Sequence, residues 1–144
     1  MRFDITARHR LYLGTDNVLE LEVFSEDGLD PNDYETDQAY DDAIVERGTM
    51  QDITGFTLRF DARKGASAND PPLITKITSN GISITGTFDA ARATNTQRVA
   101  ITLEDTDTNT LPARDYQYAL KRTDAGFEKV LADGKMALLQ SAVP

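Results

Sequence analysis

The clearest pattern in the chain is a strict alternation of apolar and polar residues after Gly55. The apolar members are Phe56, Leu58, Phe60 and Ala62. A period of two residues is typical of a β-strand with one face in a core and one in water. Because two of the four apolar residues are phenylalanines, this pattern predicts a central strand of the protein core.

Similar alternation predicts further short strands, over residues 3–8, 18–24, 73–78, 82–86, 98–104, 115–122 and 127–139. Asn80-Gly81 lies between two of them, and this residue pair favours a tight β-hairpin. Residues 123–126 are a second hairpin loop, and Asp133-Gly134 indicate a bulge or a break in the last strand. The strand end at residues 137–139 is a candidate sheet edge for strand addition by a partner.

Residues 29–51 differ in character from the rest of the chain. Nine carboxylates and no Lys or Arg lie between Glu26 and Glu46. A short helix is predicted over residues 38–47, with Gly48 at its C-cap. One face of this helix holds Ala39, Tyr40, Ala43 and Ile44. We interpret residues 29–51 as an acidic insertion before the central strand, with a tip that is mobile or docked on a partner.

The overall count of elements predicts an all-β fold. About seven to nine short strands with at most one short helix are typical of an antiparallel β-sandwich, and a closed barrel is the alternative. A chain of 144 residues is long enough for one domain, so we expect residues 1–144 to form a single domain that carries the acidic insertion.

Composition narrows the chemistry that the chain can perform. There is no cysteine, which excludes disulfides, thiolate metal sites and cysteine nucleophiles. His9 is the one histidine, and we interpret it as a surface residue between Arg8 and Arg10. The polar residues of the central strand, Arg59, Asp61, Arg63 and Lys64, are interpreted as a solvated face. We expect no enzymatic activity and no cofactor.

Charge and hydropathy bear on partners. A formal net charge of −9 without a cluster of Lys and Arg argues against nucleic acid and favours a basic protein partner. No apolar run reaches transmembrane length, and the first residues lack the apolar core of a signal peptide. We therefore expect a chain that is made in the cytoplasm and has no membrane partner.

Several motifs, taken in order, resemble one known family. They are Asp4-Ile-Thr, Gly14 before Leu-x-Leu-x-Val at 19–23, Asp27-Gly28, Ile-Thr-Gly-Phe-Thr-Leu-Arg-Phe at 53–60, Ile-Thr-Lys-Ile-Thr-Ser at 74–79, Asn-Gly-Ile-Ser-Ile at 80–84, Val-x-Ile-x-Leu at 99–103, and Leu-Pro-Ala-x-x-Tyr-x-Tyr-x-Leu at 111–120. Their order and spacing resemble the immunoglobulin-like domain of tailed-phage structural proteins, with the N-terminal domain of baseplate upper proteins as the nearest example. The resemblance omits residues 29–51, and Arg114 stands where the family usually has glycine.

The resemblance implies both a fold and a role. The fold would be an immunoglobulin-like β-sandwich, with Tyr116 in a tyrosine corner whose hydroxyl bonds to upstream backbone. The role would be that of a virion structural protein of the tail, baseplate, neck or head fibre. Such a protein acts through contacts with other virion proteins, and a homo-oligomer is a further expectation.

Candidate site residues fall into three groups. Those expected to support the fold are Tyr116, Phe56 and Phe60. Those expected to contact a partner are Tyr34, Tyr40, Asp41 and Asp42. Weak candidates for calcium ligands are Asp30, Asp33, Glu35 and Asp37, which offer hard oxygen ligands but do not have the spacing of an EF-hand loop. The alternative function is a carbohydrate- or calcium-binding module for adhesion to a host surface.

Overall fold

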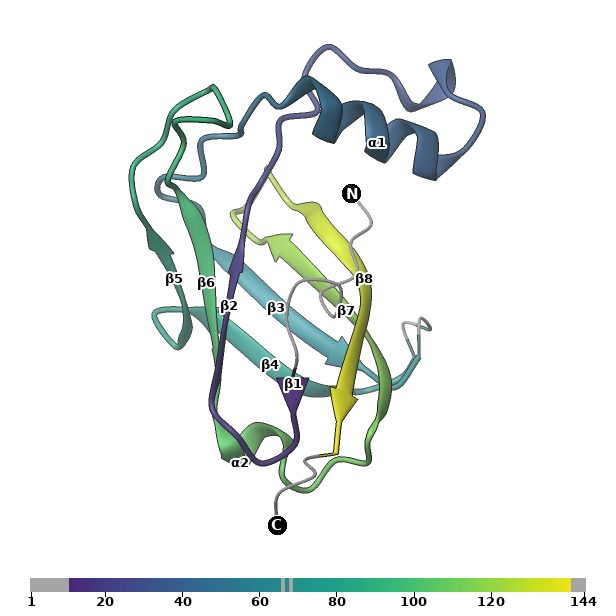
Figure 1. Ribbon diagram of the computed structural model, residues 1–144, viewed down its shortest axis with the longest axis vertical. Helices are drawn as coiled ribbons and strands as arrows, with labels where there is room; N and C mark the ends of the chain where they lie inside the picture. Colours follow the sequence, from purple (N-terminus) through teal and green to yellow (C-terminus); the bar gives the residue numbers. More distant parts are fainter. Residues whose placement is uncertain (1–10, 66, 68, 141–144) are drawn as a thin grey trace.

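The computed structural model describes residues 11–65, 67 and 69–140. In this part of the chain, one eight-stranded sheet curls into a nearly closed barrel with a helix across one end (Figure 1). The strands are β1 (Leu11–Tyr12), β2 (Asn17–Leu21), β3 (Leu58–Arg63), β4 (Pro72–Thr78), β5 (Gly81–Thr85), β6 (Arg98–Leu103), β7 (Arg114–Arg122) and β8 (Lys129–Leu139). The helices are η2 (Pro31–Asp33), α1 (Asp37–Arg47) and α2 (Asp105–Thr108).

The strand order explains why the sheet curls so far. It runs β1-β8-β7-β3-β4-β5-β6-β2, so the two edge strands are consecutive in the sequence. A short turn through Gly14 joins β1 to β2, which brings the two edges toward each other at the front of the barrel (Figure 1). Most neighbours are antiparallel, and the prediction of a β-rich fold is confirmed.

The predicted central strand is β3, which lies between β4 and β7. Leu58, Phe60 and Ala62 point into the barrel and are buried. The ring of Phe60 stacks on Tyr118 of the neighbouring strand β7, with the ring centroids 5.8 Å apart. Burial of large apolar side chains is the main favourable term in folding, so this pair anchors the core. Phe56 precedes the strand and is only partly buried.

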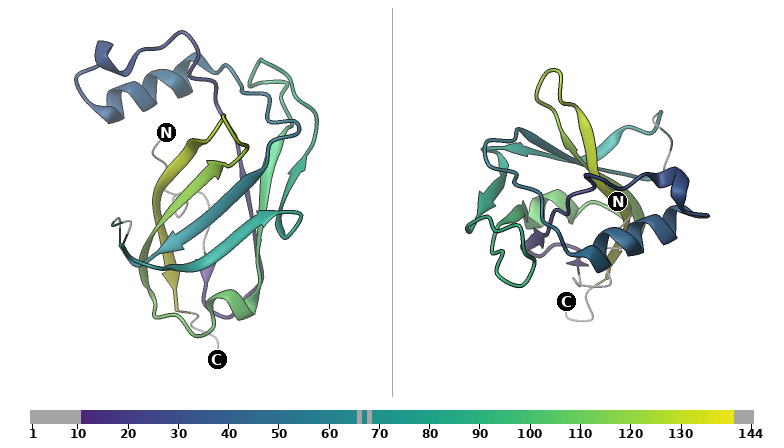
Figure 2. Two further views of the ribbon diagram at one scale, coloured as in Figure 1. Left: turned by 180° about the vertical axis from the view of Figure 1, so that it is seen from behind. Right: turned by 90° about the horizontal axis from the view of Figure 1, so that it is seen from above.

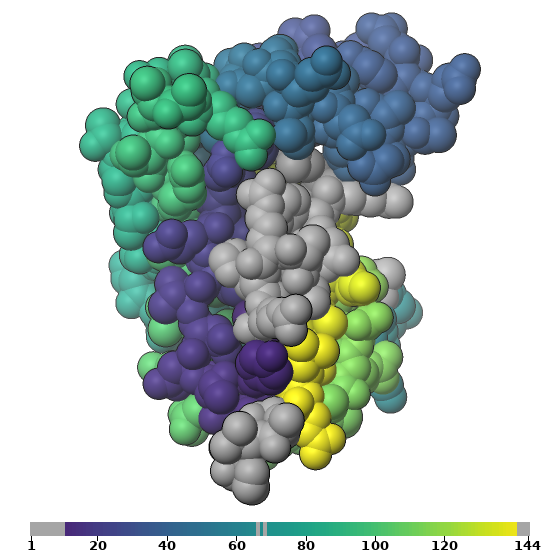
Figure 3. Space-filling model, viewed as in Figure 1, coloured from purple at the N-terminus to yellow at the C-terminus, as the bar shows by residue number. Residues whose placement is uncertain are grey.

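The acidic insertion forms the predicted helix and packs on the barrel. The hydroxyl of Thr36 caps the start of α1 by accepting from the Ala39 amide, and Gly48 ends the helix with a φ of 66°. Ile44 is fully buried in an apolar cluster with Phe24 and Met50. The helix therefore covers one end of the barrel, as the second view and the space-filling view also show (Figures 2 and 3).

The prediction of a β-hairpin at Asn80-Gly81 is wrong. Strands β4 and β5 meet over two residue pairs in parallel, and β5 instead pairs antiparallel with β6. Ser79 and Gly81 adopt φ values of 70° and 96°, so the chain makes a tight turn and continues in the same direction. A turn-forming residue pair permits positive φ angles, but it does not decide which strand pairs with the one that follows the turn.

Two expectations for the last strand are also corrected. Its register shifts where Leu131 has no partner, opposite Leu120 and Lys121, whereas Asp133 and Gly134 stay within the ladder. Residues 137–139 are not a free edge, because Leu138 and Leu139 pair with β1. The first strand that the sequence predicts, over residues 3–8, lies outside the described residues.

Candidate functional site

An arginine lies between two phenylalanine rings at the end of the barrel that carries the insertion. The guanidinium carbon of Arg122 is 3.7 Å from the ring centroid of Phe56 and 4.8 Å from that of Phe127. A cation over an aromatic face is attracted by the ring quadrupole. Phe127 remains 64% exposed, the largest exposed fraction among the large apolar residues of the described chain. We call Phe56, Arg122 and Phe127 the aromatic–arginine cluster.

Asp124 fixes the orientation of this arginine. Its Oδ2 lies 2.8 Å from Arg122 Nε and also accepts from the Thr57 amide at 2.9 Å. The hydrogen bond from Arg122, followed by that from Thr57, lowers the pKa of Asp124 to about 2. The turn between β7 and β8 is thereby tied to the start of β3, so the cluster is held before any partner arrives.

A small pocket opens beside the cluster. It has a volume of about 200 Å³, and its walls include Phe24, Glu26, Gln51 and Leu131. Lys129 lies at the rim, with its Nζ 3.0 Å from a carboxylate oxygen of Glu26. The pocket therefore combines apolar walls with a few polar groups, which is the usual composition of a recognition site.

The tyrosines expected to contact a partner lie near this pocket. The hydroxyl of Tyr40 donates to Glu26, and the rings of Tyr34 and Tyr40 are 5.6 Å apart. Burial, followed by the charge of Glu26, raises the pKa of Tyr40. The structure thus brings Tyr34 and Tyr40 together and joins them to the pocket through Glu26.

The two aspartates expected at the same contact are placed differently. Asp42 is exposed on α1 and accepts a hydrogen bond from the Gln38 side chain at 2.8 Å. Asp41 keeps only 6% of its surface exposed, so it lies inside the protein rather than on the contact surface. A helix turns by about 100° per residue, so adjacent aspartates face different surroundings.

The four candidate calcium ligands do not converge. Asp30 caps η2 by accepting from the Asn32 amide, and Asp33 lies within η2. Glu35 lies on the exposed bend that follows, and Asp37 is the exposed first residue of α1. Within the described ranges, no three carboxylates or histidines are grouped so that they could hold a metal ion.

A second hollow lies on the outer face of β3, β7 and β8. Its volume is about 500 Å³, and its lining includes Asp61, Arg63, Gln117, Ala119, Lys121 and Asp133. We call it the outer-face groove. Asp61 is only 4% exposed, which corrects the expectation of a fully solvated face. It accepts from the Thr75 hydroxyl at 2.8 Å and from Arg59 Nε at 2.9 Å.

Tyr116 and Phe60 are both buried in the core of the barrel. The Tyr116 ring is 1% exposed, and its hydroxyl donates to the Pro112 carbonyl at 2.7 Å. This is the bond back to upstream backbone that is expected of a tyrosine corner. Burial raises the pKa of Tyr116.

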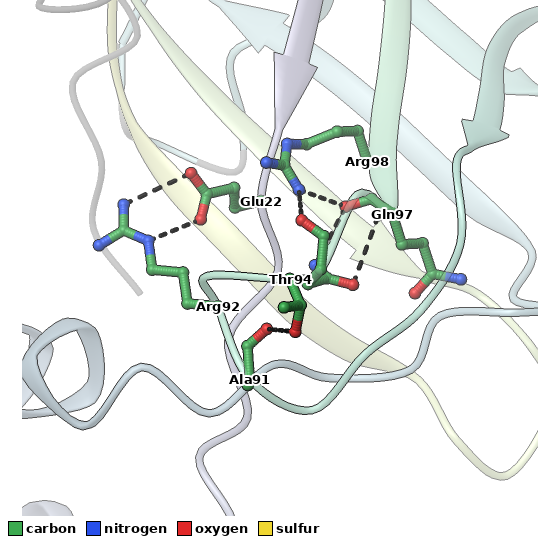
Figure 4. A network of polar contacts seen from close by, with 7 residues as sticks. Glu22, Ala91, Arg92, Thr94, Gln97 and Arg98 are labelled. Atoms are coloured by element: carbon green, nitrogen blue, oxygen red, sulfur yellow. Dashed lines mark hydrogen bonds and ion pairs between the residues drawn. The ribbon is translucent and has the colours of Figure 1, made fainter.

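A polar network that the sequence did not reveal holds the loop between β5 and β6 (Figure 4). Arg92 forms an ion pair with Glu22 at 2.9 Å, and its guanidinium lies over the ring of Phe24, which is part of the pocket wall. Buried Gln97 accepts from the Ile53 amide and donates to the Thr54 hydroxyl. The network therefore fixes the backbone that leads into the aromatic–arginine cluster.

The chain matches no protein-family model and no curated protein. Among the described residues, no helix combines the length and the apolar character needed to cross a bilayer. A function must therefore be argued from the surfaces that the fold presents.

Proposed function

We propose that the protein is an assembly module of a tailed-phage particle. It would join other virion structural proteins of the tail, baseplate, neck or head fibre through protein–protein contacts. The observation that carries this proposal is the exposed aromatic–arginine cluster. Aromatic residues and arginine are enriched at the energetic centres of protein interfaces.

The cluster is also prepared for binding. Arg122 is held by Asp124 and stacked on Phe56, so it has little rotamer freedom left to lose when a partner covers it. Immobilising a free side chain costs about 0.5–1.5 kcal/mol, and a fixed one avoids most of that cost. The neighbouring pocket of about 200 Å³ offers space for one side chain of a partner.

The immunoglobulin-like class belongs to the same proposal. The Tyr116–Pro112 hydrogen bond supports it, because this contact is typical of the tyrosine corner of such sandwiches. The single hydrogen-bonded sheet favours the barrel alternative instead. In either architecture the proposal assigns no catalytic residue, and it locates the function on the surface.

The proposal is tested on intact phage particles. Particles are purified by density gradient, and their proteins are identified by mass spectrometry. We expect this chain among the virion proteins, at a copy number that matches a symmetric substructure. Its absence from intact, infectious particles would refute the proposal.

A carbohydrate-binding module for host adhesion is the second candidate. One observation favours it, namely that the exposed ring of Phe127 borders a pocket that also contains Glu26 and Gln51. Pockets of this kind can hold a ligand by stacking and a few hydrogen bonds. Glycan-array binding that is lost in Phe127→Ala would support this candidate, and a blank array would eliminate it.

A further inference from the structure

The outer face of β3, β7 and β8 carries a cluster of cations, although the protein as a whole is acidic. Arg59 lies opposite Lys121, and Arg63 lies opposite Gln117, which in turn lies opposite Lys135. Residues directly opposite each other in an antiparallel pair share one face of the sheet. Four cations and the three carboxylates of Asp61, Asp115 and Asp133 therefore share the outward face of three adjacent strands. The net charge of this face is +1, whereas that of the whole chain is −9.

This face is hollow at its centre and retains an unpaired cation. Ala119 lies between the long side chains of the flanking rows, so the outer-face groove reaches a volume of about 500 Å³. Arg59 and Arg63 share the buried carboxylate of Asp61. Lys121 is half-buried at the groove and forms no ion pair with any described residue. A half-desolvated ammonium of this kind favours an incoming carboxylate.

The complementary surface is the tip of the acidic insertion. Asp30, Asp33 and Glu35 are exposed on η2 and the turn after it. In Figures 1 and 2 this tip overhangs the end of the barrel, whereas β3, β7 and β8 form its wall. Because α1 is docked through Ile44 and through Arg47, which donates to the Ser25 and Asp27 carbonyls, the tip is held away from its own groove.

We infer that the outer-face groove receives the acidic tip of a second copy of this chain. The contact is head-to-tail, because the two surfaces are different patches of the molecule. Contacts of this type close into a ring or continue as a filament. This self-contact adds a specific partner to the proposed assembly role. It depends on that role only for the claim that the contact forms within a phage particle.

Charge screening decides when this contact can form. The Debye length is about 8 Å at an ionic strength of 0.15 M, so the net charge of two approaching copies is largely screened. The attraction between the carboxylates of the acidic tip and the Lys121 ammonium acts at shorter range and is screened less. The contact is therefore expected to weaken as salt rises further, because exposed carboxylates supply half of each pair.

The first test measures self-association by sedimentation velocity at about 150 mM NaCl, where the repulsion between the net charges of two copies is largely screened, and at about 500 mM NaCl. We expect concentration-dependent association at the lower salt concentration that is lost at the higher one. Lys121→Glu and Asp33→Lys should each weaken association about tenfold or more. The double variant should restore it, and because its net charge equals that of the wild type, this recovery cannot come from net charge.

The matched control for Asp33→Lys is Glu128→Lys, which makes the same charge change on an exposed residue outside both surfaces. This control reduces the net negative charge as Asp33→Lys does, and its association constant should stay within about twofold of that of the wild type. Circular dichroism and melting curves verify that each variant is folded. A chain that stays monomeric at the lower salt concentration, or a Lys121→Glu variant that associates as the wild type does, would overturn the inference.

The second test identifies the contact directly. A carbodiimide, which couples a lysine amine to a carboxylate without a spacer, is applied to a mixture of ¹⁴N- and ¹⁵N-labelled chains. We expect Lys121 to be linked to Asp30, Asp33 or Glu35 in peptides that contain one chain of each label. Links within one chain only, or no link from Lys121, would contradict the inference.

The outcome is separable from that of the proposed function. A chain that associates through this contact but is absent from virions would refute the assembly role in a particle and leave the head-to-tail contact standing. A chain that is present in virions, with Lys121 linked only to a different protein, would refute the contact and leave the assembly role standing.

Discussion

The hydroxyl of Tyr116 is a single contact that can be removed without changing the shape of the core. Tyr116→Phe deletes the 2.7 Å bond to the Pro112 carbonyl and keeps the buried ring. We expect a loss of about 1 kcal/mol in the free energy of unfolding, measured by urea denaturation. Tyr34→Phe is the control and should change stability by under about 0.5 kcal/mol. Equal effects of the two substitutions would show that the bond does not stabilise the fold.

Asp124 is expected to make stability depend on pH in the acid range. Its pKa is about 2 in the folded protein, below the ordinary value of 3.8. A carboxyl group with a lowered folded pKa contributes stability above its unfolded pKa and loses it as the pH falls through the folded one. Asp124→Asn should therefore flatten the fall in unfolding free energy between about pH 4 and pH 2. Glu128→Gln in the same turn should leave that fall unchanged.

Single residues also show how far the sequence could predict the candidate site. Alternation assigned Phe56 and Phe60 to the same buried face, which is right for Phe60. Phe56 lies just before β3, which begins at Leu58, and Arg122 covers its ring. Phe127 follows the glycine of a hairpin loop, a place where an exposed aromatic could be suspected. Its meeting with Phe56 depends on strand pairing, which no local pattern contains.

Two glycines with similar backbone angles allow a matched test of the loop that the polar network holds. Gly86 and Gly126 have φ values of 76° and 83°. A Cβ at Gly86 would lie 2.0 Å from the Thr96 carbonyl oxygen, whereas a Cβ at Gly126 would meet nothing within 4 Å. Gly126→Ala should cost about 1–2 kcal/mol, from the backbone conformation alone. Gly86→Ala should cost at least about 2 kcal/mol more, because the backbone of the loop must also move.

This difference is measured from urea midpoints at constant m-value. Hydrogen exchange should show the extra loss in the loop between β5 and β6 and in the segment before β3, which Gln97 holds. If Gly86→Ala and Gly126→Ala lowered the free energy of unfolding equally, the close approach of the Thr96 carbonyl to Gly86 would not contribute to the loss.

Elements with local signals were predicted well, and elements defined by their neighbours were not. Helix α1 has an N-cap hydroxyl, an apolar face and a C-cap glycine within one short stretch, so its bounds match the expectation closely. The turn at Asn80-Gly81 has an equally strong local signal, but β5 finds its antiparallel partner in β6. The pairing with β6, the next strand along the chain, decided that choice. The outer-face groove was missed for the same reason.

Phe60 and Phe127 separate what keeps the molecule folded from what it offers to a partner. Phe60 is fully buried on Tyr118, whereas Phe127 is 64% exposed on Arg122. Phe60→Ala leaves a cavity in the barrel and should lower the free energy of unfolding by about 3–5 kcal/mol. Phe127→Ala removes little buried surface and should lower it by under about 1 kcal/mol.

Phe127→Ala should have little effect on stability but a large effect on the incorporation of this chain into phage particles. Phage that carry Phe127→Ala should contain much less of this chain per particle, although the variant melts close to the wild type, because the centre of the proposed contact surface is gone. Quantitative mass spectrometry of purified particles measures this, with Glu128→Gln as the exposed control in the same turn. If a folded Phe127→Ala variant were incorporated as well as the wild type, the contact with the particle would not lie at the aromatic–arginine cluster. The outer-face groove would then be the surface to test next.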